Sequence, residues 1–238
     1  MRPNGVRGLF AAVFGDGESE EAPLEKLLHV AQVLGAVPSV VTAEVRCGCE
    51  PRTYHLIRPQ EYFRSVVSRL VELISPSAKA SPAYIRAASF TLSRMITKGS
   101  NPRYHPIVSS VFFSLLHDPI LLTTRGSSTE TVTTLSPFEA IQAVQTLLTN
   151  TDPAPTLVST VLSPIASSLY VLLSTLLNLR TADPTLRESV RGLLFSWGRV
   201  VPTDEAVAIL WACIEGEGGY WAVDFTGNAK RVEKCVYT

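Results

Sequence analysis

Apolar residues recur along most of this chain at the spacing of an amphipathic α-helix. In the segment 59–75 they fall on two adjoining rows of a helix and form one broad apolar face. That face comprises Tyr62, Phe63, Val66, Val67, Leu70, Val71 and Ile74. Many of the helical segments open with a proline, which suits the first turn because the N–H group there needs no partner within the helix. The pattern predicts an all-α protein.

Further helices follow from the same spacing. They are predicted over residues 6–14, 23–35, 82–98, 105–117, 137–150, 184–200 and 203–215. Ser136 and Glu139 are placed to form a capping box at the start of one helix, and Asp183 and Thr203 are the expected N-caps of two others. Helices that follow one another without a concentrated polar site predict an α-solenoid of HEAT-like helical pairs, an architecture that presents surface to partners.

The pattern divides the chain into three parts. Residues 1–22 are expected to form a short helix and an acidic linker, and residues 23–215 the helical array. Within the array, residues 37–58 lack a helical period and are interpreted as an irregular insertion. Residues 216–238 change to an alternation of period two, as at Trp221, which predicts a small C-terminal β-hairpin.

The segment Pro153–Leu179 contains twenty-seven residues without a charge. A membrane-spanning helix needs about twenty mainly apolar residues, so the segment is long enough to span a bilayer. Prolines interrupt it, however, and its polar residues Thr160, Ser163, Ser167 and Ser174 keep the spacing of one helical face. We therefore expect a buried solenoid element, and Pro164 favours two helices over one. A membrane span is the less favoured interpretation.

Composition narrows the possible functions. Charged residues make up 18% of the chain, below the usual quarter or so, and 21 basic residues balance 21 acidic ones. Because phosphate neutralisation supplies most of the affinity of nucleic-acid binders, a neutral chain with scattered basic residues is not expected to bind nucleic acid. The four cysteines follow no secretory signal, so we expect reduced thiols and a cytoplasmic location.

The sequence gives little support to a catalytic or metal site. Cys47, Cys49 and His55 would supply three of the four ligands of a zinc site, but structural zinc favours Cys-x₂₋₄-Cys spacing. The chain has no nucleophile elbow, P-loop or dinucleotide fingerprint. His117 is expected at a helix C-terminus, where a positive charge complements the helix dipole. We expect no enzymatic activity, no metal and no cofactor.

The helical spacing also predicts which tryptophans are buried and which polar residues share an exposed face. Trp197 and Trp211 are placed on the inner faces of successive helices and are both expected in the core. The helices 82–98, 137–150 and 184–200 are expected to be the second members of successive pairs, with their outer sides on one face. The polar residues on that face are Arg86, Arg94, Lys98, Gln142, Gln145, Arg187 and Arg191.

Three of these arginines are the candidate partner-binding residues. Arg94, Arg187 and Arg191 form a modestly basic set, which favours an acidic or mixed-charge protein segment as the partner. The alternative interpretation is that these arginines lie on an ordinary solvated helix surface and bind no partner.

Several segments resemble a known family. They are Gly5–Phe10, Ala22–Ala31, Pro59–Phe63, Arg86–Met95, Ser114–Pro119, Leu193–Arg199 and Ile209–Gly216. Together they are similar to the fungal factor required for nuclear transport of RNA polymerase II and to its animal relatives, the transport and Golgi organisation group. The family's proteins are far longer, so the chain is interpreted as a fragment or a truncated gene product. Residues 41–57 do not fit the family pattern and are interpreted as an insertion or a translated intron.

The resemblance implies a HEAT-like scaffold that aids the assembly and nuclear import of RNA polymerase II. The partners it implies are polymerase subunits, assembly cochaperones and nucleoporins, and the location is the cytoplasm with shuttling to the nucleus. No catalytic residue is implied. The alternative function is a membrane-associated component of secretory or Golgi trafficking, anchored through residues 157–179.

Overall fold

The computed structural model describes residues 5–15, 22–36, 59–97, 103–122, 135–152, 154–179, 183–224 and 229–232. These residues are predominantly helical and end in a small antiparallel sheet, which confirms the predicted all-α class with a hairpin. In chain order the helices are α1 (Gly5–Phe14), α2 (Leu24–Gly35), α3 (Pro59–Ile74), the 3₁₀ turn η1 (Pro76–Ala78), α4 (Pro82–Ile96), α5 (His105–Leu116), α6 (Asp118–Leu121), α7 (Pro137–Thr149), α8 (Pro155–Asn178), α9 (Pro184–Val200) and α10 (Thr203–Glu215). The strands are β1 (Tyr220–Val223) and β2 (Ala229–Val232).

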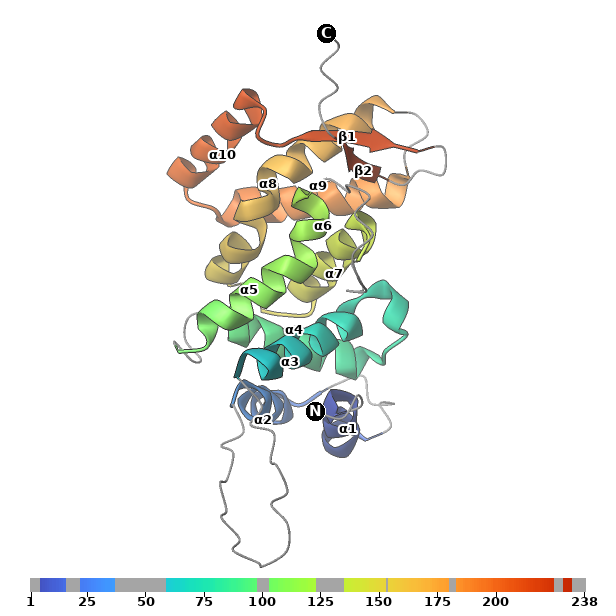
Figure 1. Ribbon diagram of the computed structural model, residues 1–238, viewed down its shortest axis with the longest axis vertical. Coiled ribbons are helices and arrows are strands. Elements are labelled where there is room, and N and C mark those ends of the chain that lie inside the picture. The colour runs from blue at the N-terminus through green and yellow to red at the C-terminus, as the bar shows by residue number, and fades with distance from the viewer. Residues whose placement is uncertain are drawn as a thin grey trace, which may run out of the picture.

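The helices stack in two layers. In one layer α2 packs against α4, α4 against α7, and α7 against α9. In the other, α3 packs against α5, the short α6 packs between α5 and α8, and α8 packs against α10. Figure 1 shows the stack running from α1 and α2 at one end to α10 and the hairpin at the other. This is the arrangement of an α-solenoid, in which each helical pair buries its apolar face on its neighbours.

Helix α3 illustrates how the sequence pattern becomes packing. All seven apolar side chains of its predicted face are buried. The Tyr62 hydroxyl donates a hydrogen bond of 3.2 Å to the carbonyl of Leu34, which ties α3 to the end of α2. Burial raises the pKa of Tyr62 because the charged phenolate would be desolvated.

The predicted helix starts are largely correct. The backbone N–H of Glu139 donates to Ser136 Oγ at 3.2 Å, and the Ser136 N–H donates to the Glu139 carboxylate at 2.9 Å, which confirms the capping box. Asp183 Oδ1 accepts from the N–H of Thr185 at 2.8 Å. Thr203, by contrast, is not an N-cap. It is the first helical residue of α10 and follows Pro202, so α10 begins without a side-chain cap.

The expectation of two helices around Pro164 is wrong. One helix, α8, runs through Pro164 from Pro155 to Asn178. An internal proline costs about 3 kcal/mol because it removes one backbone hydrogen bond. Nine apolar side chains of α8 are buried, each contributing about 1.5–3 kcal/mol when it is a full-sized aliphatic residue, so packing outweighs that cost. Pro164 itself is exposed, so its ring does not disturb the packed side of the helix.

The C-terminal hairpin is confirmed and is docked on the array. Strands β1 and β2 are antiparallel, with Trp221 opposite Arg231. Trp221 is buried, and the Arg231 guanidinium donates to the carbonyl of Ile120 at 3.1 Å and to Ser168 Oγ at 2.9 Å. These bonds join the hairpin to α6 and α8. Phe225 lies outside the described residues.

The two tryptophans expected in the core differ. Trp197 on α9 is 6% exposed and donates from its indole to Ser163 Oγ at 3.1 Å, as predicted for a core residue. Trp211 on α10 is 60% exposed, so its predicted burial is wrong. Helix α10 packs mainly on α8, and the opposite side of the helix, which carries Trp211, has no neighbour among the described elements. Helical spacing finds such a face but does not show whether anything covers it.

Candidate functional site

The predicted partner-binding arginines lie on α4 and α9. Arg94 is exposed near the end of α4, with its guanidinium 5.9 Å from the centre of the Phe90 ring. Arg191 is exposed on α9 and lies 5.4 Å from the centre of the Phe195 ring. Each arginine therefore keeps its charge toward solvent while an aromatic face supports its planar group. Arg187 lies one turn before Arg191, and its Nε is 3.8 Å from the Glu188 carboxylate.

The helices that carry these arginines belong to the same layer. Helix α7 packs between α4 and α9, so the three helices follow one another as the sequence predicted. Gln142 and Gln145 on α7 are half-buried, and Arg86 on α4 is exposed. Lys98, the remaining basic member of the predicted set, lies outside the described residues. Helices α4 and α9 thus lie in one layer, and partner binding by Arg94, Arg187 and Arg191 stays a prediction.

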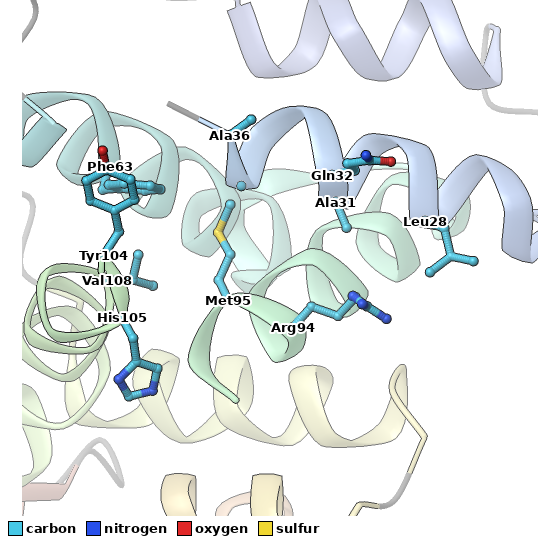
Figure 2. Close-up of a pocket in the computed structure, with 11 residues that line it drawn as sticks. Leu28, Ala31, Gln32, Ala36, Phe63, Arg94, Met95, Tyr104, His105 and Val108 are labelled. Carbon is cyan, nitrogen blue, oxygen red and sulfur yellow. The ribbon is translucent and has the colours of Figure 1, made fainter. Parts of the chain in front are cut away.

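A cavity of about 540 Å³ opens beside Arg94. Four helices form it, and Figure 2 shows its lining side chains. Its apolar part comes from Leu28 and Ala31 on α2, Phe63 on α3, Met95 on α4 and Val108 on α5. Its polar part comes from Gln32, Arg94, Tyr104 and His105. Sequence periodicity missed this cavity because its walls come from four separate helices and only packing brings them together.

The polar groups of the cavity have different roles. The His105 ring is held in place by a hydrogen bond of 2.5 Å between its Nε2 and the Ile96 carbonyl oxygen. Arg94 is exposed and extends from α4 along the side of α2 that carries Leu28, as Figure 2 shows. An apolar pocket beside a guanidinium suits an apolar side chain whose neighbour carries a carboxylate. The cavity therefore lies beside one residue of the predicted basic set, Arg94.

A second cavity, of about 620 Å³, lies between the end of α4 and the helices α8 and α10. Its wall includes Ser159, which donates a hydrogen bond of 3.1 Å to the Glu205 carboxylate. That bond links α8 to α10. The Ser159 hydroxyl and the Glu205 carboxylate thus hold two helices together at the end of the array.

His117 was expected to be a charged group at a helix end, and that expectation is wrong. The residue does follow α5, but its side chain is 2% exposed and stacks on Phe113 with 4.7 Å between the ring centres. Burial lowers its pKa to about 4, and a hydrogen bond with the Val161 backbone opposes this shift only in part. His117 is therefore neutral at physiological pH and serves as a packing residue.

The described residues give little support to metal binding or to nucleophilic catalysis. Among them, no three His, Cys, Asp or Glu side chains come close enough to hold a metal ion. Cys47, Cys49 and His55 lie outside the described part of the chain. Cys213 is a half-buried free thiol, and burial raises its pKa, which disfavours the reactive thiolate.

One helix of the described residues is long and apolar enough to cross a membrane. It is α8, with 24 residues and a mean hydropathy of 1.7 over its most apolar window. Half of that window is buried inside the protein, mainly against α9. Length and composition do not distinguish such a helix from the core helix of a soluble protein.

The chain matches the model of a known protein family. The family model described as "Transport and Golgi organization protein 6 homolog, ARM-like repeat" matches residues 1–231. The match covers nearly the whole chain, and a stack of paired helices is the architecture that an ARM-like repeat forms. Neither a curated protein nor a solved structure matches the chain.

Proposed function

Because the chain belongs to the family of the ARM-like repeat of Transport and Golgi organization protein 6 homologs, we propose that it is a non-enzymatic scaffold in the assembly and nuclear import of RNA polymerase II. The family match carries this proposal, since it places the chain among helical-repeat proteins of transport and organization. Its partners in this role are polymerase subunits, assembly cochaperones and nucleoporins. It works in the cytoplasm and shuttles to the nucleus.

The predicted partner surface supports a scaffold role. In helical-repeat proteins one layer of helices lines an extended binding surface. Here α4 and α9 belong to one layer and carry Arg94, Arg187 and Arg191, and the cavity of about 540 Å³ opens beside Arg94. A client segment with acidic side chains and an apolar anchor matches this combination.

The experiment is affinity purification from cells followed by mass spectrometry. In the test variant Arg94, Arg187 and Arg191 are all changed to Glu, which should lower the recovery of polymerase subunits and leave the circular dichroism spectrum unchanged. In the matched control Arg64, Arg69 and Arg103, which are exposed on or beside α3 and α5 in the other layer, receive the same change. Equal recovery of polymerase subunits by the test variant and the native chain would rule out this surface.

A membrane-associated role in secretory or Golgi trafficking is the second candidate function. The observation that favours it is the length and hydropathy of α8. The burial of half of that helix favours the scaffold instead. Extraction with alkaline carbonate separates the two, because it strips a peripheral scaffold from membranes and leaves a spanning protein in the pellet. Retention in the pellet would replace the scaffold proposal with the membrane one.

A further inference from the structure

Helix α10 exposes a continuous apolar stripe. Its members are Val207, Leu210, Trp211 and Ile214, whose exposed fractions are 59%, 44%, 60% and 75%. The spacing i, i+3, i+4 and i+7 places them on one side of the helix. The opposite side, which includes Ile209 and Cys213, is half-buried. Helix α10 therefore differs from an ordinary surface helix, because the side that carries its larger apolar residues faces solvent.

An exposed apolar stripe of this size is unusual on a soluble protein. Single exposed apolar residues are common, but contiguous apolar patches on soluble proteins mark interaction sites. The α10 stripe consists of four large side chains that include a tryptophan, a residue enriched at binding hot spots.

The charges around the stripe identify the kind of partner. From Val201 to Ala229 the chain contains five carboxylates and no lysine, arginine or histidine. Asp204 and Glu215 are exposed and lie on the same edge of the stripe by helical spacing. Glu215 accepts a hydrogen bond of 2.7 Å from the Trp211 indole, which connects the acidic edge directly to the apolar stripe.

This charge pattern decides between possible occupants. A second copy of the chain would bring Asp204 and Glu215 against the same carboxylates, and like charges placed together oppose binding. An anionic membrane surface would be repelled in the same way. A helix with basic residues beside its apolar positions has the complementary charge.

We propose that the α10 stripe is a docking surface for an amphipathic α-helix of a partner protein, with Lys or Arg flanking its apolar residues. The partner's apolar residues pack on Val207, Leu210, Trp211 and Ile214, and its basic residues pair with Asp204 and Glu215. This surface is separate from the arginines of α4 and α9, so it does not depend on the proposed function.

The test uses the full chain and two synthetic helical peptides. Both peptides repeat leucine at i, i+3, i+4 and i+7, and the flanking positions are lysine in one and glutamate in the other. Trp197 and Trp221 are buried, so quenching of tryptophan fluorescence by acrylamide reports mainly on Trp211. We expect the lysine peptide to protect Trp211 in a saturable way and the glutamate peptide to have no effect.

Substitutions within the stripe test whether the lysine peptide binds there. Ile214→Asp should abolish the protection, and Val207→Asp should do the same independently. Leu24→Asp, at an exposed apolar position on α2, is the matched control and should bind like the native chain. Asp204→Asn and Glu215→Gln should each weaken binding of the lysine peptide by up to about fivefold, the usual limit for an exposed ion pair.

Several results would overturn the proposal. Equal binding of both peptides would reduce the stripe to non-specific apolar contact, and binding of neither would remove it as a helix-docking surface. Sedimentation velocity that reveals a dimer of the native chain, lost in Ile214→Asp, would assign the stripe to a second copy. Protection of Trp211 by vesicles of anionic phospholipid would assign it to a membrane.

Discussion

The indoles of Trp197 and Trp211 have opposite surroundings although both lie on the last helices of the array. Trp197 packs in the core and donates to Ser163 on α8. Trp211 lies in solvent and donates to Glu215 on its own helix. The first hydrogen bond joins two helices, whereas the second only fixes a side chain on one helix.

This difference predicts unequal effects of truncation. Trp197→Ala should lower the free energy of unfolding by about 3–5 kcal/mol, because it leaves a cavity between α8 and α9. Trp211→Ala should lower it by less than about 1 kcal/mol, because little buried area is lost. Urea denaturation followed by circular dichroism measures both. Similar losses for the two variants would contradict the assigned burial.

Burial of His117 predicts a pH dependence of stability. The unfolded chain binds a proton on this residue near pH 6.5, and the folded chain does so only near pH 4. The free energy of unfolding should therefore fall by about 3 kcal/mol as the pH drops from 6.5 to 4, with no loss above that window. His117→Phe should flatten this part of the profile in urea titrations at several pH values.

The control for that experiment is His29→Gln, at an exposed position on α2, which keeps the buried histidine. Its profile should retain the slope of the native chain between pH 6.5 and 4. A slope that disappears in this control and persists in His117→Phe would show that another group causes the acid sensitivity.

At the scale of single elements, α8 carries a proline in its middle without breaking. Pro164→Ala restores a backbone N–H donor and should raise the free energy of unfolding by about 1–3 kcal/mol. Pro155→Ala changes a proline in the first turn, where no intrahelical bond is lost, and should change stability little. Chemical denaturation measures the change in the free energy of unfolding for both variants. A destabilised Pro164→Ala variant would mean that the proline itself is part of the packing.

The hairpin depends on glycine for its close approach to α8. A Cβ at Gly218 would meet the Val171 side chain and would lie 2.7 Å from the Ser167 carbonyl oxygen. Gly218→Ala should therefore lift the hairpin and expose Trp221 to acrylamide quenching. Gly192→Ala is the matched control, because nothing lies within 4 Å of its Cβ position and alanine favours the helix of α9. Unchanged quenching in Gly218→Ala would contradict the tight docking.

Most helix bounds were predictable from the sequence because helical periodicity and capping are local, although the break expected at Pro164 in α8 was wrong. The start of α7 at Pro137 needs only Ser136 and Glu139, which lie within one turn. Burial depends on which helices come together, and that is why His117 and Trp211 were placed wrongly. The cavity beside Arg94 was missed for the same reason. The exposure of Arg94 and Arg191 was predictable because the exposed polar positions of a helix follow from its apolar face, whereas their role in partner binding stays a prediction.

At the scale of the whole molecule, burial is uneven along the array. Eight of the 16 residues of α3 and eight of the 15 residues of α4 are buried, which are larger shares than in the longer α8, whereas α10 buries none completely. Backbone amides of α10 should therefore exchange with deuterium fastest among the long helices, and those of α3 and α4 slowest. Hydrogen exchange with mass spectrometry measures this order. Strong protection of α10 in the isolated chain would mean that its apolar stripe is already covered.

Stacking in two layers also determines how the molecule responds to force. Each helix packs mainly on its neighbours in the stack, so a small rotation at one interface moves everything beyond it. Rotations at successive interfaces add along the axis, and the two ends move far while each contact changes little. We therefore expect the array to bend as a whole, through small changes at many interfaces.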